Sequence, residues 1–473
     1  MLENLSANEI VSSIYRKEIT PEEVASYYLD RINKFNPILN AIVSLKKEDM
    51  IIEEAKSLTQ TETNQDMLLF GLPLAIKDLF DVKGLPTSYG LSLYKSNIAK
   101  KNSILVDRLI KHGAIIIGKT NIPELAIGSH TTNKLYGVTA NAYDQSKTAG
   151  GSSGGAATAV AASLVPFADG SDMMGSCRNP AAYANLYGYR PTPGLIPEDR
   201  NMKIDSIFPL LSTPGCIART PNDLALLLDA ISGVHASDPY SFDPPSSFRK
   251  SHISDDEFLK IRVGWLGDLN KQYTFEDGIL NMCENVLKRL DEDFLSVNQE
   301  TSIINTSDLW HSWTTLRAKN NYLHLEEANL QEHPDLGFGA QWELEKGKEL
   351  KTEDLKVAFS QREECKKIAD QMFGKYDFLV MPSAQVFPFE KDKDYPKKIS
   401  DKNMDSYHRW MEVVTFSSLL GLPSISVPVG FSKSGLPMGM QIIGKKGYDL
   451  NVVAFAKKYE EIFNHSTNRP NGF

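Results

Sequence analysis

Two serines and one lysine are the residues of this chain best placed to do chemistry. Lys77 follows a short apolar run, Ser152 lies in the sequence GGSSGG, and Ser176 follows the sequence DMMG. Such small-residue turns let side-chain oxygens and backbone N–H groups face one shared space. A serine hydroxyl attacks poorly until a neighbouring base takes its proton. No histidine lies beside these residues in the sequence, so Lys77 is the candidate base, and burial would favour its uncharged form.

A set of short motifs resembles, in order, those of the amidase signature family of serine hydrolases. They are GLPLAIKD at 71–78, GKTNIPE at 118–124, GGSSGG at 150–155, GSCRNPAA at 175–182, RPTPG at 190–194, ART at 218–220 and GLPMGMQIIG at 435–444. Several motifs in one order are far more specific than any single motif. The resemblance covers about half of the chain and implies an amidohydrolase that needs no cofactor.

The resemblance also implies a role for each of the three residues. Ser176 would attack the amide carbonyl, and Lys77 would be the base. Ser152 would carry protons between them, and its peptide bond with Gly151 would be cis. Four backbone N–H groups would form an oxyanion hole, which holds the negative charge that develops on the carbonyl oxygen. These groups belong to Met173, Met174, Gly175 and Ser176.

Three supporting residues follow the family pattern, and two positions depart from it. Ser153 is expected to bond within its loop, and Asp172 and Arg178 are expected to pair and brace the loop of the nucleophile. Met174 stands where the family usually has glycine, so its backbone must avoid a glycine-specific conformation. Cys177 stands where an aliphatic residue is usual, and we expect a small buried side chain. Both departures bear on the shape of the pocket more than on the chemistry.

Two other motifs would give different functions. GSSGG at 151–155 fits the nucleophile elbow of α/β-hydrolases, in which Ser153 would be the nucleophile and His408 or His465 the base. GAIIIGKT at 113–120 fits the phosphate loop of nucleotide-binding proteins. Its variable positions are an alanine and three isoleucines, which favour a buried strand over a phosphate cradle.

A further alternative lies within the same family. The amidase subunit of a tRNA-dependent amidotransferase works in a complex and passes ammonia to a partner. The acidic charge of this chain and its Met173-Met174 pair weigh against that function. We therefore expect an amidohydrolase that acts on a small-molecule amide, and esters, anilides or carbamates would suit the same machinery.

The elements that position these residues indicate an α/β fold. From residue 71 onward, β-branched or apolar runs at 114–117 and 164–167 alternate with helical stretches at 104–112 and 155–162. This alternation is typical of a mixed β-sheet that lies mostly at the centre of the fold and is covered by helices on both faces. Late strands are expected at 378–382, 424–429 and 438–443, so that the sheet combines early and late segments. Capping motifs at Ser6 and Thr20 predict two N-terminal helices.

We predict a single amidase domain over residues 1–473, with the signature core at 71–223. Residues 236–375 are charged and rich in helix formers, and they predict a largely helical insertion that shapes the substrate pocket. Helices are expected at 280–290, 310–330 and 352–373. Five aromatic residues of the insertion and the tail belong either to an apolar substrate pocket or to the core. They are Trp310, Trp313, Tyr322, Tyr407 and Trp410.

Composition narrows the class of partner. The net charge of −9 disfavours binding to nucleic acid or to an anionic membrane, because both need a basic patch. No apolar stretch reaches the length of about 18 residues that a membrane span needs. The four cysteines lack a C-x-x-C pair and the nine histidines are scattered, so no metal site is expected. Unpatterned cysteines and the absence of an apolar leader predict a cytoplasmic protein. The family suggests a homodimer.

Overall fold

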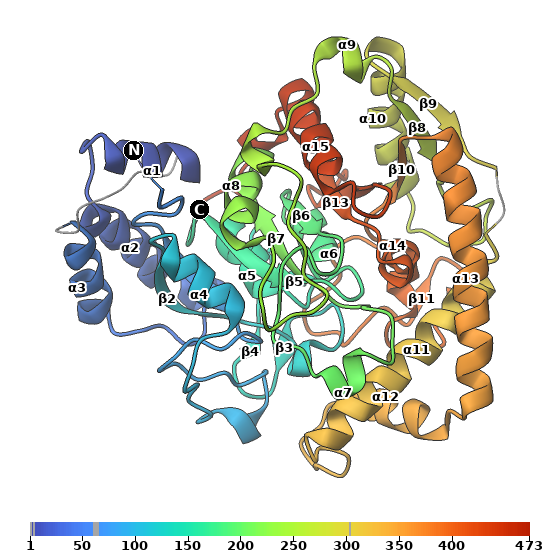
Figure 1. Cartoon of the computed structure of the whole chain (residues 1–473), viewed down its shortest axis with the longest axis horizontal. Coiled ribbons are helices and arrows are strands. Elements are labelled where there is room, and N and C mark those ends of the chain that lie inside the picture. Colours follow the sequence, from blue (N-terminus) through green and yellow to red (C-terminus); the bar gives the residue numbers. More distant parts are fainter. Residues whose placement is uncertain (1, 3–4, 60–65, 302–303) are drawn as a thin grey trace.

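The structure is a computed structural model and describes all residues except 1, 3–4, 60–65 and 302–303. A central eight-stranded sheet is covered by helices on both faces, which confirms the predicted α/β class (Figure 1). Among the described residues, no helix is long and apolar enough to cross a membrane.

The strands are short and most of their residues are buried. They are β1 Pro73–Lys77, β2 Ile115–Thr120, β3 Thr132–Asn133, β4 Gly137–Val138, β5 Phe167–Ser171, β6 Tyr187–Arg190, β7 Pro214–Ala218, β8 Arg262–Trp265, β9 Ser296–Gln299, β10 Phe378–Pro382, β11 Lys398–Ile399, β12 Lys402–Asn403, β13 Ser424–Phe431 and β14 Pro437–Ile443.

The helices lie between these strands. They are α1 Ala7–Tyr15, α2 Pro21–Leu39, α3 Glu48–Thr59, α4 Ile104–Lys111, α5 Gly154–Ala161, α6 Arg178–Ala182, α7 Met202–Asp205, α8 Pro221–Ile231, α9 Asp255–Phe258, α10 Ile279–Asp293, α11 Thr306–Glu327, α12 Phe338–Glu349, α13 Thr352–Lys375, α14 Thr415–Leu420 and α15 Asp449–Phe463. Ser6 and Thr20 cap α1 and α2 as predicted, each in a capping box with a glutamate three residues later.

The main sheet mixes segments from distant parts of the chain. Its strand order is β5-β7-β6-β13-β14-β10-β8-β9. Strand β8 pairs in parallel with β10 and β9, and the other pairs are antiparallel. The early strands β5, β6 and β7 therefore share one sheet with the late strands β10, β13 and β14, as the sequence predicts.

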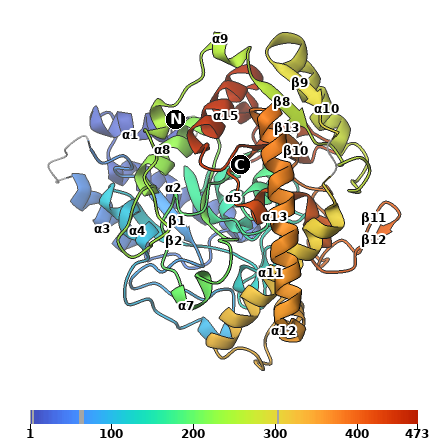
Figure 2. The ribbon, with the colours of Figure 1, turned by 45° about the vertical axis from the view of Figure 1, so that its right-hand side comes forward.

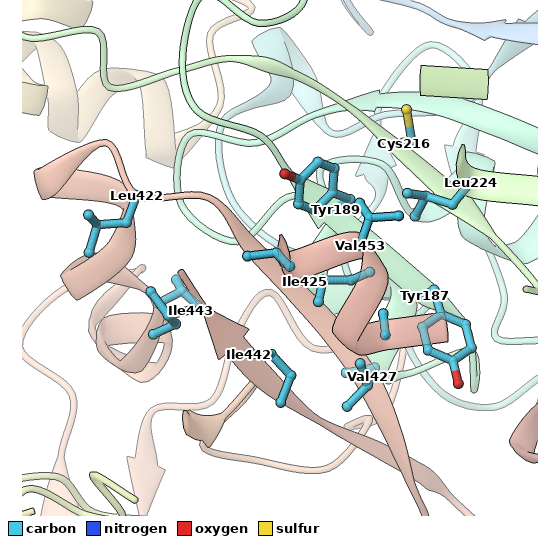
Figure 3. Packing of buried hydrophobic residues seen from close by; sticks show 14 of the residues in the cluster. Tyr187, Tyr189, Cys216, Leu224, Leu422, Ile425, Val427, Ile442, Ile443 and Val453 are labelled. Carbon is cyan, nitrogen blue, oxygen red and sulfur yellow. The ribbon is translucent and has the colours of Figure 1, made fainter. Parts of the chain in front are cut away.

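Strand β6 shows how the two faces of the sheet are covered. Tyr187 and Tyr189 point to one face, where their hydroxyls donate to Glu460 and Asp449 of α15. Gly188 faces the other side, where an added Cβ would lie only 2.3 Å from the carbonyl oxygen of Cys177, just before α6. Alternate residues of a strand point to opposite faces, so β6 is packed on both. Figure 3 shows both tyrosines within the apolar packing.

A separate parallel pair, β1–β2, carries one end of the candidate site. It joins the main sheet through a side chain instead of a backbone ladder. The N–H of Lys77, the last residue of β1, lies 3.2 Å from both carboxylate oxygens of Asp169 on β5. This contact sets the end of β1 against the end of β5.

Three sequence-based expectations differ in detail from the structure. Residues 164–166 precede β5 instead of belonging to it, because Ser163 has a positive φ of 54° and Pro166 has no N–H to pair. Several helices, among them α3, α8, α12 and α15, were not predicted. The segment 236–375 is mostly helical, but it also supplies β8 and β9 to one edge of the sheet. Helices α11, α12 and α13 lie together at one side of the molecule (Figure 2).

Candidate active site

Lys77 is held in a fully buried position. All five residues of β1 are buried, and the Lys77 side chain is 0% exposed. Its Nζ lies 2.8 Å from each of three hydroxyl oxygens, which are Ser152 Oγ, Ser153 Oγ and Ser171 Oγ. The contact between Lys77 and Ser152 is the one that the family resemblance implies. Ser171 is an additional partner.

Burial changes the proton affinity of this amine. It lowers the pKa of Lys77 to about 8, because the charged form loses its hydration, while the carboxylates of Asp169 and Asp172 oppose the shift. Burial also raises the pKa of Asp169 to about 6. With a pKa near 8, about one Lys77 side chain in ten is uncharged at pH 7. The side chain can therefore accept a proton near neutral pH.

The loop of Ser152 has an unusual backbone. The Gly151–Ser152 peptide bond is cis, as the resemblance implies. Gly150 has a φ of +72°, and a Cβ there would lie 2.8 Å from Asn179 Oδ1, so a side chain has no room. The Ser129 hydroxyl lies 2.6 Å from the Gly151 carbonyl oxygen. These contacts hold the Ser152 side chain toward Lys77.

Ser176 follows a left-handed turn. Gly175 has a φ of +77°, and a Cβ there would lie 3.0 Å from the Val414 side chain. The Ser176 carbonyl accepts a hydrogen bond of 3.2 Å from the Ser153 N–H, which joins the two serine loops. Ser176 is 7% exposed and lines a cavity that Ser152 also lines.

The four amides expected in the oxyanion hole are not equivalent. The Gly175 N–H donates to Asp172 Oδ1 at 2.9 Å, so this amide already has an acceptor. The N–H groups of Met173, Met174 and Ser176 form no hydrogen bond within the described part of the chain. Three of the four amides are thus free to bind an oxygen, and Gly175 serves the turn instead.

Asp172 organises this turn through several contacts. Its carboxylate pairs with Arg178 at 2.8 Å and accepts the Cys177 N–H at 3.1 Å, so the predicted ion pair is confirmed. Arg190 donates to the Asp172 carbonyl. Burial alone would raise the pKa of Asp172, but the charges of Arg178 and Arg190 outweigh it and hold this pKa far below the usual range. Asp172 is therefore a charged brace.

The two departures from the family pattern are accommodated. Met174 has no positive φ, so its backbone does not need glycine, and its side chain lines the cavity while being 5% exposed. Cys177 is fully buried, as expected, and burial raises the pKa of its thiol. Met174 therefore shapes the cavity, whereas Cys177 fills space beneath the loop.

The cavity has a volume of about 870 Å³. Ser152, Ser171 and Ser176 line one part of it, and α11 lines another part with Arg317 and residues that follow it. Of the five aromatic residues considered above, none lines this cavity. Trp310, Trp313 and Tyr322 are absent from its wall, whereas Tyr407 and Trp410 line a smaller cavity of about 310 Å³.

The structure contradicts the elbow interpretation of Ser153. The Ser153 side chain is fully buried, lies 2.8 Å from Lys77 Nζ and does not line the cavity. The two histidines proposed as its base lie elsewhere: His408 packs 5.0 Å from the Trp310 ring, and His465 stacks on Tyr459.

The phosphate-loop interpretation of 113–120 is also wrong. Residues Ile115–Thr120 form β2, whose residues are all buried. Lys119 pairs with Asp78 at 3.3 Å and donates to the Phe80 carbonyl at 2.7 Å, so it cannot reach a phosphate. The same ion pair turns Asp78 away from Lys77, as strand alternation predicts.

Sequence reasoning missed Asp169 and Ser171. Both lie on β5, two residues apart, and both contact Lys77. Residues two apart in a strand share a face, so the signal was the pattern D-G-S directly before Asp172. Because the strand was expected at 164–167, before these residues, this face was not recognised.

Comparison with known proteins agrees with this geometry. The family model Amidase matches residues 23–453. The chain is 31% identical to an acylamidase of Rhodococcus erythropolis, over 97% of this chain and 95% of the relative. It is also 31% identical to a glutamyl-tRNA(Gln) amidotransferase subunit of Methanosarcina acetivorans, over 96% of each.

A solved structure shows the same fold. The crystal structure of a bacterial aryl acylamidase of the amidase signature family superposes with a TM-score of 0.90 at 25% identity, covering 98% of this chain and 99% of that one. The chain belongs to the amidase signature family and is a hydrolase of carbon–nitrogen amide bonds.

Proposed function

We propose that Lys77, Ser152 and Ser176 form a catalytic triad that cleaves a carboxylic amide through a serine acyl-enzyme. One observation carries the proposal: the buried Lys77 amine lies 2.8 Å from Ser152 Oγ, and Ser152 and Ser176 line one cavity. A buried amine with a pKa of about 8 accepts a proton far more readily near neutral pH than a free lysine does.

The reaction then has two halves. Ser176 Oγ attacks the carbonyl carbon, its proton passes to Ser152 Oγ, and the Ser152 proton passes to Lys77 Nζ. The C–N bond breaks as the proton returns along the same path to the leaving nitrogen, and the acyl group stays on Ser176. Water then attacks this ester with the same proton transfers, which releases a carboxylic acid and restores the free serine.

We assign the oxyanion hole to three amides, those of Met173, Met174 and Ser176. They have no other acceptor in the described residues, whereas the Gly175 N–H is bound to Asp172. Fixed amides of this kind stabilise the developing charge without reorganisation. Ser153 would hold Lys77 in place, and Asp172 with Arg178 would hold the turn.

A serine-directed fluorophosphonate probe tests the nucleophile. The probe should label one serine, peptide mapping should find the label on Ser176, and Ser176→Ala should abolish labelling. Ser212→Ala is the matched control and should keep the label, because Ser212 also lines the cavity but is not one of the three hydroxyls around Lys77. A label on Ser153 would overturn the assignment.

The charges of the cavity favour a hydrolase over the amidase component of an amidotransferase. A free carboxylate, as in glutamine, binds best to a cation whose charge is not already neutralised by a protein carboxylate. Lys101, Arg200 and Arg317 line the cavity, and each is already in an ion pair within the described structure. Neutral amides should therefore be hydrolysed faster than glutamine, and a preference for glutamine would favour the amidotransferase interpretation.

The substrate range and the setting of the enzyme are further proposals. We propose that the segment 236–375 shapes the substrate pocket, since α11 supplies one wall of the cavity. A panel of aliphatic amides, anilides, esters and carbamates would define the acyl and amine preferences.

The four cysteines are free and buried, which supports a reducing compartment such as the cytoplasm. A homodimer and the lack of a nucleic-acid partner stay predictions.

A further inference from the structure

One face of α11 forms a polar wall of the cavity. Arg317, Asn320, Asn321 and His324 all line it. Their spacing of three, four and seven residues places them along a single face of the helix. This wall is therefore built by one rigid element, which belongs to the segment outside the recognised motifs.

The two outer members of this face already have protein partners. Arg317 forms an ion pair with Glu343 and donates to the Tyr407 hydroxyl at 2.8 Å. His324 Nε2 lies 3.2 Å from Asp205 Oδ1. These contacts hold both side chains in place against other parts of the protein.

The two central members lack protein partners. Asn320 is 8% exposed, and its side-chain amide bonds to no other residue in the described part of the chain. Asn321 Nδ2 is buried and likewise finds no acceptor among the described residues. A buried polar group without a partner costs about 1–3 kcal/mol, so the buried Asn321 Nδ2, with the unpartnered Asn320 amide beside it at the cavity wall, indicates a ligand that satisfies both side chains.

The chemistry of this wall specifies the ligand group. A carboxamide offers both an N–H donor and a carbonyl acceptor, so two of them suit a group with the same two functions. The cations that line the cavity are already paired, and Asp81, which also lines it, has no ion pair within the described residues. A free carboxylate on the ligand is therefore disfavoured, and an uncharged group is favoured.

We infer that Asn320 and Asn321 bind a second, uncharged amide group of the substrate, distinct from the one that is cleaved. The inference rests on the proposed function for the identity of the scissile end. The substrate class is then a neutral compound with two amide groups, of which Ser176 attacks one and α11 holds the other. Asn320 and Asn321 determine specificity and take no part in the bond-breaking steps.

A matched pair of compounds tests this inference by binding alone. Hippuramide carries a second amide, and 4-phenylbutanamide has a hydrocarbon chain of the same length in its place. In the inert variant Ser176→Ala, calorimetry should show that hippuramide binds about 5- to 100-fold more tightly. Adding Asn320→Leu and Asn321→Leu should remove most of this difference, while Leu325→Met, at an apolar position of the same wall, should leave it unchanged.

Turnover separates the inference from the proposed function. In the otherwise native enzyme, the asparagine variants should lower kcat/KM for hippuramide by a similar factor and change that for 4-phenylbutanamide by less than about threefold. Equal binding of both compounds to Ser176→Ala, or an equal loss for both in the variants, would overturn the inference. If binding discriminates but neither compound is cleaved, the inference stands and the proposed hydrolysis fails. Asn320→Ala and Asn321→Ala replace any leucine variant that does not fold.

Discussion

The pocket of Lys77 and the wall of α11 differ in whether their polar side chains have hydrogen-bond partners within the protein. Around Lys77, three hydroxyls lie at 2.8 Å from one buried nitrogen, and a neighbouring carboxylate is bound by arginine and by backbone amides. On α11, two carboxamides face the cavity with no partner among the described residues. Both regions line or adjoin the same cavity.

The difference separates chemistry from recognition. A group that transfers protons needs fixed neighbours, because a shift of its pKa or its position changes the rate. A group that recognises a substrate must keep its hydrogen-bonding capacity for the ligand. Around Lys77 the polar side chains are therefore bound to one another, whereas α11, outside the signature core, leaves two carboxamides open toward the cavity. Changes in the two regions should have different consequences, which the following predictions exploit.

The largest effect is expected from removal of the Lys77 amine. Lys77→Ala should lower kcat/KM by about three orders of magnitude or more, because the proton path loses its base. Lys77→Arg should rescue nothing, since arginine stays charged. Steady-state kinetics gives the loss, and circular dichroism should show that both variants fold. Near-normal turnover of Lys77→Arg would mean that Lys77 has a structural role as a cation.

Removal of the Asp172 charge should affect stability most. Asp172→Asn would leave Arg178 and Arg190 buried without their anion, which costs about 3–5 kcal/mol of the free energy of unfolding. Asp199→Asn is the control, because it breaks an exposed pair with Lys101 and should cost less than about 1 kcal/mol. Urea denaturation measures both. If both variants lose the same small amount of unfolding free energy, the buried Asp172–Arg178 pair does not stabilise the turn.

The pH dependence follows from the lowered pKa of Lys77. Only the uncharged amine accepts a proton, and its fraction increases with pH until the pKa of about 8 is passed. We therefore expect kcat/KM to rise about tenfold per pH unit below pH 8 and to level off above it. A stopped assay in overlapping buffers would show this. Activity that instead falls between pH 7 and 9 would contradict a neutral lysine base.

A smaller loss is expected when one neighbour of the amine is removed. Ser171→Ala takes away one of the three hydroxyls at 2.8 Å from Lys77 Nζ, so kcat/KM should fall by about 5- to 100-fold. Ser171→Thr keeps a hydroxyl and should retain most activity. The loss should come with a shift of the basic limb of the pH profile. A loss without any shift would indicate that Ser171 acts on the substrate instead of on Lys77.

Much of this molecule is predictable from sequence, for identifiable reasons. Capping boxes such as that of Ser6 depend on residues three apart, and the contact between Lys77 and Ser152 follows from a family resemblance. The hydrogen bond from the Gly175 N–H to the Asp172 carboxylate was not predictable, because it depends on the backbone path of one turn. The polar wall of α11 was missed for a related reason: the cavity that it faces is completed by distant segments, such as those of Asp81 and Asp199.

No effect is expected from removal of metal or nucleotide. The described residues contain no group of three or more histidine, cysteine, aspartate or glutamate side chains that could hold a metal ion. Lys119, the lysine of the phosphate-loop pattern, is buried in an ion pair with Asp78. Hydrolysis should therefore survive exhaustive dialysis against a chelator in the absence of ATP. Activity that is lost and returns only with zinc or Mg-ATP would refute this prediction. Lys77 could then not be sufficient for proton transfer, and a bound metal ion or nucleotide would have to take part in the reaction.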